Sequence, residues 1–430
     1  MENRAGYKKT ELGWIPEEWD LLKLKNIIEL MTDYVANGSF KALREHITVH
    51  DNDNYAIFVR LFDLRIGLGH SKQKYVDKIS YDFLSKSNLY GNEILMANIG
   101  ANVGEVFLMP LIDKPATIAP NMIIIKPSKN SVDNKYLFLF FKSDFGIMEL
   151  NKIIAGSGHP KINKTELKTV NIILPPLPEQ QKIASILTTV DDKISSIEAQ
   201  IQQTEQLKKG LMAKLLTEGI GHTEFKDTEI GRIPESWEVK ILIDAAEKIS
   251  DGIHTTPKYC PDTEYYFING NNLSKGNIVI DEKTKCVSRS EFLKHKKELN
   301  LYTILLSING TIGNLAFYNN EKVILGKSAS YIILSKHIDK QYVYYLLQTD
   351  KIQKYFLLEV TGTTIKNLSI KSIKNCKIPL PPLPEQQQIA SILSSVDDKL
   401  DVLQSKKTSY STLKKGLMAK LLTGQMRVKI

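Results

Sequence analysis

The feature that most constrains this chain is an internal repeat. LPPLPEQQKIASILTTVDDKI at 174–194 returns as LPPLPEQQQIASILSSVDDKL at 380–400, and LKKGLMAKLLT at 207–217 returns unchanged at 413–423. Both matches have the same offset of 206 residues, so the segments that separate the two motifs have equal length in both copies. Chance does not produce two matches of this length at one offset, and the chain is therefore a duplication.

A shorter repeat marks where each copy begins. TELGWIPEEW at 10–19 resembles TEIGRIPESW at 228–237, which lies 218 residues further on. The order along the chain is thus a variable segment, a constant segment, and the same again. We expect globular domains at 1–173 and 228–379, and helical regions at 174–227, with a linker at its end, and at 380–430.

Each constant segment has the pattern of a long helix that begins at a proline-rich stop. After Pro178 and its counterpart Pro384, apolar residues recur at spacings of three and four over about four heptads, which is typical of a coiled coil. The seam residues are Ile183, Leu187, Val190, Ile194, Ile197 and Ile201 in the first copy, and Ile389, Leu393, Val396, Leu400 and Leu403 in the second.

The helix ends are marked by glycine. Gly219 and Gly221 follow the first pattern and Gly424 follows the second. We expect helices at about 179–217 and 385–423 that pack antiparallel through the seam. Polar side chains, among them Thr204, Lys208 and Lys414, interrupt the seam towards its end.

The variable segments have a mixed pattern of strands and helices. Short β-rich runs alternate with Gly and Asn turns, and each segment ends with a helix-like stretch, at 134–145 and 339–356, then a glycine corner and a strand. The β-rich runs lie at 55–59, 122–125, 322–325 and 331–334. The predicted fold class is α/β (α+β): two globular domains separated by a long antiparallel two-helix coiled coil with pseudo-twofold symmetry.

Composition adds a few limits. Three cysteines are too few for a disulfide framework and form no C-x-x-C pair, so we expect a reducing compartment and no zinc site. No apolar run approaches membrane-spanning length, and we expect a cytoplasmic protein. The formal charge of +9 is compatible with a polyanionic partner, but many proteins without such a partner carry as much.

Catalytic signatures are missing from the sequence. Gly326-Lys327-Ser328 has the tail of a phosphate-binding loop, but Glu321 stands where its first glycine is required. The repeated Asp-Asp-Lys of 191–193 lies within a heptad pattern, and we expect it on a solvated face with local ion pairs. His46 and His50 have helical spacing but no acidic or cysteine companion, so no metal site is expected.

The doubled L-P-P-L-P-E-Q-Q and L-K-K-G-L-M-A-K-L-L-T motifs and the G-W-I-P-E-E-W opening resemble the specificity (S) subunit of type I restriction-modification systems over the whole chain. The resemblance implies a non-catalytic subunit with two target recognition domains, each reading half of a bipartite site in double-stranded DNA. It also implies two modification (M) subunits, which methylate adenine at N6 with S-adenosylmethionine, and restriction (R) subunits that use ATP and Mg where they are present. The resemblance implies no cofactor in this chain.

Candidate reading residues come from short polar loops. The stretch D-G-I-H-T-T-P-K at 251–258 resembles a D-G-x-H-x-T-P pattern of such recognition domains, and 33–41 lies equally far past the other shared opening. The loops 60–63 and 269–272 each follow a predicted strand. Arg suits guanine, Asn suits adenine, and Asp accepts from cytosine N4. The candidate DNA-binding residues are Asn37, Ser39, Lys41, Arg60, Asp63, Lys72, Lys74, His159, Lys161, His254, Thr255, Thr256, Lys258, Asn269, Asn272, Lys275, Arg289 and Lys366.

Two alternatives stay open at this stage. Asn-Gly and Asp-Gly pairs also form plain turns, and a coiled-coil scaffold that never touches DNA would suit the helices.

The near-identity of the two helical regions extends to Glu179, Gln180, Gln181 and Lys208. We expect these four residues on the surface, where two equivalent patches would dock two identical modification subunits.

Overall fold

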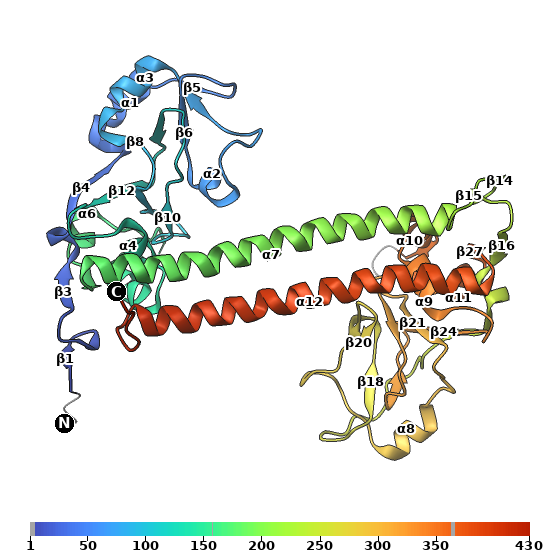
Figure 1. Ribbon diagram of the computed structural model, residues 1–430. Coiled ribbons are helices and arrows are strands. Elements are labelled where there is room, and N and C mark those ends of the chain that lie inside the picture. The colour runs from blue at the N-terminus through green and yellow to red at the C-terminus, as the bar shows by residue number, and fades with distance from the viewer. Residues whose placement is uncertain (1–4, 157, 363–365) are drawn as a thin grey trace. The chain divides into compact units, whose positions relative to one another are not determined.

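The chain divides into two compact units in a computed structural model that describes residues 5–156, 158–362 and 366–430 (Figure 1). The first unit comprises Met1–Ile197 with Lys406–Ile430, and the second comprises Glu198–Ser405. Two long helices, α7 (Leu177–Glu218) and α12 (Leu383–Leu421), each contribute one part to either unit. The unit boundaries therefore fall inside the helices, and the division at the helix starts stays a prediction.

The helices have the predicted extent. α7 ends directly before Gly219 and α12 ends three residues before Gly424. Both glycines adopt the left-handed conformation that other residues avoid, with φ of +66° and +71°. Every predicted seam residue is buried or half-buried. Within the first unit Ile183 and Leu187 share a core with Leu421, and within the second Leu393 shares one with Leu215.

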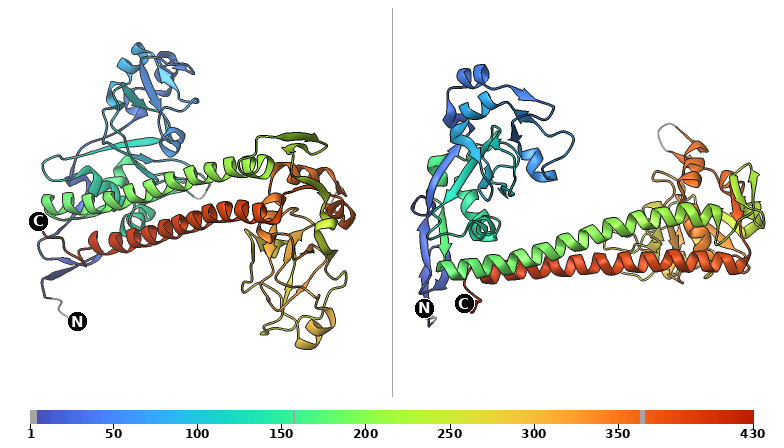
Figure 2. Two further views of the ribbon diagram at one scale, coloured as in Figure 1. Left: turned by 45° about the vertical axis from the view of Figure 1, so that its right-hand side comes forward. Right: turned by 45° about the horizontal axis from the view of Figure 1, so that its top comes forward.

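The helix segments run antiparallel within each unit (Figure 2). In the first unit the start of α7 packs against the end of α12, and in the second the end of α7 packs against the start of α12. Two equivalent ion pairs join them: Lys208 Nζ lies 2.6 Å from Asp397 Oδ1, and Lys414 Nζ lies 2.5 Å from Asp191 Oδ1. The first aspartate of each Asp-Asp-Lys motif thus pairs with a lysine of the other helix. The sequence had instead led us to expect local ion pairs.

The larger sheets of the first unit have four and five strands. The antiparallel sheet has the order β10 (Val106–Leu108), β9 (Ile94–Ala97), β12 (Met122–Pro127) and β4 (Ile28–Asp33). The other sheet has the order β5 (Val49–His50), β7 (Tyr75–Val76), β6 (Ala56–Val59), β11 (Ala116–Ile118) and β8 (Asn88–Leu89), and its β6 and β11 are parallel. Short helices α1 (Phe40–His46), α2 (Leu61–Ile66) and α3 (Lys78–Phe83) connect some of these strands, and α6 (Lys164–Leu167) lies further along the chain.

The second unit repeats the four-stranded order, but its counterpart of the five-stranded sheet has only two strands. Its antiparallel sheet has the order β17 (Ala246–Asp251), β24 (Ala329–Leu334), β21 (Thr303–Ser307) and β22 (Leu315–Phe317). A parallel pair, β18 (Tyr266–Ile268) with β23 (Val323–Leu325), corresponds to β6 and β11. Short elements beside these sheets are β19 (Leu273–Ser274), β20 (Asn277–Ile278), α8 (Arg289–His295), β25 (Val360–Thr361), β26 (Asn367–Leu368) and α11 (Ile370–Lys374).

Each unit also contains two shorter helices that share its apolar core with the long helices. Each stretch that was predicted as one helix forms two helices. These are α4 (Asn134–Phe141) with α5 (Asp144–Ile153), and α9 (Lys340–Leu347) with α10 (Asp350–Leu358). Ser143 caps α5 by accepting from the amide of Gly146. A Cβ at Gly146 would lie 2.1 Å from the carbonyl oxygen of Phe140, so the break depends on a close approach of the two helices.

Two short antiparallel strand pairs also belong to each unit. The first unit has β1 (Tyr7–Thr10) with β2 (Gly13–Pro16) and β3 (Asp20–Lys23) with β13 (Asn171–Leu174). The second has β14 (Phe225–Thr228) with β15 (Gly231–Pro234) and β16 (Glu238–Ile241) with β27 (Lys377–Leu380). In each unit, the strand that runs into the proline stop thus pairs with the strand that directly follows the shared opening sequence.

The doubled Pro-Glu-Gln motif serves the interior of each unit. Glu179 and Gln180 are both fully buried. Gln180 Nε2 donates to the carbonyl of Pro175 at 2.8 Å, and Gln386 Nε2 donates to that of Pro381 at 2.8 Å. The expectation that Glu179 and Gln180 lie on the surface is wrong, because Gln180 bonds the backbone beside the prolines and Glu179 accepts from the side chains of Trp19 and Arg427.

Candidate nucleic-acid interface

In the second unit, loops from distant parts of the sequence meet at one place. The loop after β17 bonds to the turn between β23 and β24: the amide of Gly252 donates to the carbonyl of Ala329 at 3.1 Å, and that of Ile253 to Leu325 at 2.7 Å. A Cβ at Gly252 would lie 2.1 Å from the Leu325 oxygen, so only glycine permits this approach. The predicted reading loop 251–258 therefore starts against this turn.

The turn at 326–328 also holds two other loops. Ser328 Oγ donates to Asn269 Oδ1 at 3.0 Å and accepts from the amide of Gly270 at 2.9 Å. The carbonyl of Ser328 accepts from the amide of Ile308 at 2.9 Å. We call these four segments, 251–254, 269–272, 308–313 and 326–328, the loop cluster of the second unit.

Asn269 and Asn272 of the loop cluster form hydrogen bonds within their own domain. Asn272 Oδ1 accepts from the amide of Asn269 at 3.0 Å, and its Nδ2 donates to the carbonyl of Val279 at 3.0 Å. Both ends of the Asn272 amide are thus bonded within the domain, so Asn272 shapes the loop and is not poised to pair with a base. Asn269 is half-buried and uses its Oδ1 on Ser328.

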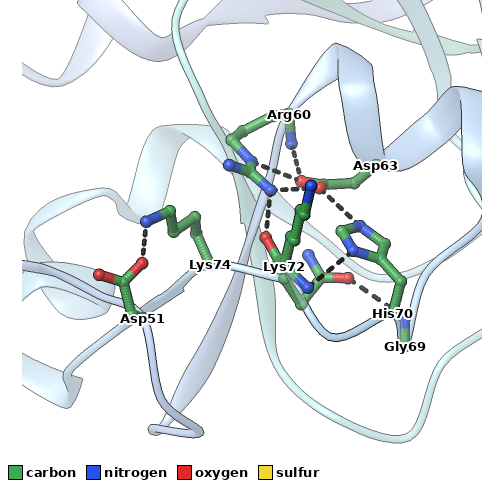
Figure 3. Close-up of polar contacts among 8 residues, drawn as sticks. Asp51, Arg60, Asp63, Gly69, His70, Lys72 and Lys74 are labelled. Atoms are coloured by element: carbon green, nitrogen blue, oxygen red, sulfur yellow. Dashed lines mark hydrogen bonds and ion pairs between the residues drawn. The ribbon is translucent and has the colours of Figure 1, made fainter.

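The corresponding loop of the first unit is built around a buried carboxylate (Figure 3). Asp63 is fully buried and accepts from the amide of Arg60 at 2.8 Å, from its Nη2 at 2.6 Å and from His70 Nε2 at 2.9 Å. Arg60 Nη2 also donates to the carbonyl of Lys72 at 2.6 Å. The expectation that Asp63 accepts from a cytosine is wrong, because its carboxylate is enclosed and occupied.

The electrostatics of this cluster follow from its contacts. Burial by itself raises the pKa of Asp63, but hydrogen bonds from the side chain and backbone of Arg60 and from His70 outweigh it, so the pKa lies below its ordinary value. The carboxylate is therefore ionised at neutral pH and holds the guanidinium of Arg60 in place. Lys74, whose ammonium pairs with Asp51, is likewise engaged (Figure 3).

The loop at 33–41 contains two further residues with internal roles. Asn37 Nδ2 donates to the carbonyl of Tyr34 at 3.0 Å and to Ser87 Oγ at 2.8 Å, while its Oδ1 accepts from the amide of Lys86 at 2.9 Å. Ser39 caps α1. Asn37 and Ser39 thus position the loop and are not free to read bases, in contrast to the sequence-based expectation.

Most of the other candidates lie on the surface. The exposed ones are Lys41, Lys72, His159, Lys161, His254, Thr255, Thr256, Lys258, Lys275, Arg289 and Lys366. His254 contacts Asp251 Oδ2 at 2.8 Å, and Lys41 lies 4.0 Å from Glu45. Exposure leaves these side chains accessible to DNA, and their individual contacts stay predictions.

Sequence reasoning missed one loop in each unit. In the first, the amide of Gly100 donates to the carbonyl of Pro160 at 2.9 Å, and in the second that of Gly310 donates to Lys366 at 3.2 Å. The loops after β9 and β21 thus bond to the residues that follow the glycine corners at 156–159 and 361–364. Ser157, Thr363 and Thr364 of those corners fall outside the described residues. The repeated glycines of both loops were the signal that could have identified them.

Two features are absent from the residues that the structure describes. No group of three or more His, Cys, Asp or Glu side chains there could hold a metal ion. None of the helices that the structure describes combines the length and apolar character needed to cross a membrane.

Comparison with known proteins places the chain among DNA specificity proteins. The type I restriction modification DNA specificity domain matches residues 16–206 and 234–409. Two Methanocaldococcus jannaschii proteins are similar over nearly their whole length. The putative type I restriction enzyme MjaX specificity subunit is 32% identical, over 98% of this chain and 97% of its own. The MjaVIII specificity subunit is 29% identical, over 96% and 94%.

Solved structures show the same fold. The S subunit of a type I restriction-modification system from M. genitalium has a TM-score of 0.58 at 16% identity and covers 96% of both chains. A chain solved in work on complex assembly and conformational transition of the type I R-M system has a TM-score of 0.55 at 16% identity and covers 96% of this chain and 99% of that chain.

Proposed function

Because the chain belongs to the type I restriction modification DNA specificity family, we propose that each of its two units reads one half of a bipartite DNA site. The chain is a non-catalytic specificity subunit, and the finer assignment concerns which parts of it do the reading. We assign the reading to 1–173 and 228–379, and the spacing and docking roles to the helical regions that follow them.

One observation carries this assignment: the same strand ends gather loops in both units, but the loops differ in sequence. β6 and β11 of the first unit match β18 and β23 of the second in pairing and direction. The segments that follow β6 and β18 are Arg-Leu-Phe-Asp at 60–63 and Asn-Gly-Asn-Asn at 269–272. Asp63 and Asn272 are bonded within their own units, so the assignment depends on the different loop sequences that equivalent frames carry, as two different half-sites require.

The helical regions are the proposed platform for modification subunits. Once the buried residues of the motif are set aside, repeated positions that stay exposed include Gln181 with Gln387 and Lys209 with Lys415. Two equivalent exposed surfaces would seat two identical partners. In such an assembly the modification subunits supply S-adenosylmethionine chemistry, and restriction subunits, where present, supply the ATP- and Mg-dependent steps. Free cysteines are compatible with a cytoplasmic location, which we also propose.

The competing function is a scaffold that never contacts DNA. Fluorescence anisotropy of the full chain with its modification subunits on random-sequence duplex DNA, over a series of salt concentrations, separates the two. A reader should bind with log K falling linearly as log salt rises, with a slope near −0.9 for each phosphate neutralised. Binding indistinguishable from that of the modification subunits alone would favour the scaffold.

A further inference from the structure

The turn at 326–328 holds a lysine whose backbone is fixed on both sides. The amide of Gly326 donates to the carbonyl of Ile268 at 2.8 Å, and Ser328 bonds to Asn269, Gly270 and Ile308, as described above. Lys327 itself is exposed. Its ammonium makes no hydrogen bond or ion pair with any residue that the structure describes.

The Lys327 ammonium does not stabilise the loop cluster by an ion pair or a hydrogen bond with any described residue. Lys322, which precedes β23, by contrast pairs with Glu264 at 2.6 Å. The hydrogen bonds of Ser328 hold the turn without any help from the Lys327 side chain. Lys327 therefore presents a positive charge, on a well-held backbone, between the loops that we expect to face DNA.

The first unit lacks this charge at the equivalent place. Its turn between β11 and β12 contains Pro120 and Asn121, and the Asn121 carbonyl accepts from the amide of Asn98 at 3.1 Å, as that of Ser328 accepts from Ile308. Pro120 thus occupies the position of Lys327. A contact to the phosphate backbone would serve both half-sites alike, so its presence in one unit only favours a base contact particular to one half-site.

We propose that Lys327 contacts a guanine in the half-site read by the second unit, with its ammonium donating to the O6 and N7 atoms at the major-groove edge. Lysine lacks an acceptor, and guanine is the base whose major-groove edge offers two adjacent acceptors. This inference rests on the proposed function, because it assigns one base contact within the site that the second unit reads.

The test compares Lys327→Ala with Lys336→Ala. Lys336 follows the other end of the same strand, β24, is exposed, and has no partner among the described residues. The full chain with its modification subunits is used to select duplexes from a random-sequence DNA library. For Lys327→Ala we expect the preference for guanine at one position of the second half-site to fall about 10-fold, with the first half-site unchanged. Lys336→Ala should select the wild-type site.

Several results would overturn the inference. These are an unchanged site for Lys327→Ala, a uniform loss of affinity without a change of preference, the same change for Lys336→Ala, or a second half-site without guanine. If the wild-type complex selects no bipartite site at all, the proposed function fails. If the wild type selects one and Lys327→Ala selects it equally well, only the assignment of Lys327 fails.

Discussion

At the scale of single residues, buried carboxylates show why parts of the doubled motif did not diverge. Glu179 accepts from Trp19 Nε1 at 2.9 Å and from Arg427 Nε at 2.7 Å. Its counterpart Glu385 lies 2.8 Å from His222 Nε2, so each unit gives its glutamate a nitrogen partner from the segment after a long helix. A buried carboxylate without partners would be strongly destabilising, which explains why the glutamate was retained in both copies.

The same reasoning predicts the effect of Asp63→Asn. The asparagine cannot accept from Arg60 and His70 as the carboxylate does, and we expect a loss of about 3 kcal/mol in the free energy of unfolding. Asp53→Asn is the matched control, because Asp53 pairs with Lys114 at 2.5 Å but is 76% exposed, and it should cost no more than about 0.5 kcal/mol. Urea unfolding of both variants measures the difference, and equal costs would contradict a structural role for Asp63.

The cost of Asp63→Asn should depend on pH. The folded pKa of Asp63 is lowered, so its contribution to stability is fully present above the unfolded carboxyl pKa of about 3.9. It is lost as the pH falls through the lower folded value. The urea midpoints of wild type and Asp63→Asn should therefore differ at neutral pH and converge in acid. A difference that persists at the lowest pH would show that lost packing, and not lost charge, is responsible.

At the scale of elements, the long helices are held by an apolar seam with a few polar positions. The side chains of Lys208 and Asp397 are 21% and 31% exposed, and Asp397 also accepts from Tyr345 Oη at 2.8 Å. Desolvation followed by the hydrogen bond to Asp397 raises the pKa of Tyr345. Polar pairs inside a seam add little stability but restrict the register in which two helices pack. The equivalent pair of Lys414 and Asp191 does the same in the first unit.

Adjacent residues of α12 provide a test of the seam. Leu393 is fully buried, whereas Ile392 is 37% exposed. Leu393→Ala should cost about 2–5 kcal/mol, because it removes buried methyl groups and leaves a cavity. Ile392→Ala should cost less than about 1 kcal/mol. Thermal unfolding of the two variants gives the comparison, and a larger cost for Ile392→Ala would mean that the seam follows a different face.

At the scale of the whole molecule, the duplication divides the labour between two similar units. Each unit has its own sheets, its own apolar cores and its own share of both long helices. The residues that hold each frame together recur at the 206-residue offset, as with Gln180 and Gln386. The exposed loops do not recur, so specificity can change in one unit without disturbing the other.

Exchange of residues 240–373 for the same span of another family member tests this independence. Methylation mapping in a host that also expresses the modification subunits should show a changed second half-site and an unchanged first. The reciprocal exchange of 22–167, the span that aligns with it through the two repeat offsets, should change only the first. Alteration of both half-sites by either exchange would contradict the assignment of one half-site to each unit.

The sequence by itself determined the duplication, the extent of both long helices and the positions of the seam. These features depend on local information: heptad spacing, prolines at the start and glycines at the end act within a few residues of where they stand. The helix-like stretches before the glycine corners were less well determined, because the close approach at Gly146 that divides one of them involves a neighbouring helix.

Only the tertiary structure decided which polar residues are buried and which loops meet. Glu179 and Asp63 look like surface residues in the sequence, but their burial depends on partners far along the chain or in a folded loop. The meeting of Gly252, Asn269 and Ser328 depends on strand order and register, since hydrogen bonds between strands join residues whose separation no local pattern records. For that reason Lys327, rejected as part of a phosphate-binding loop, stands out only once its neighbours in space are known.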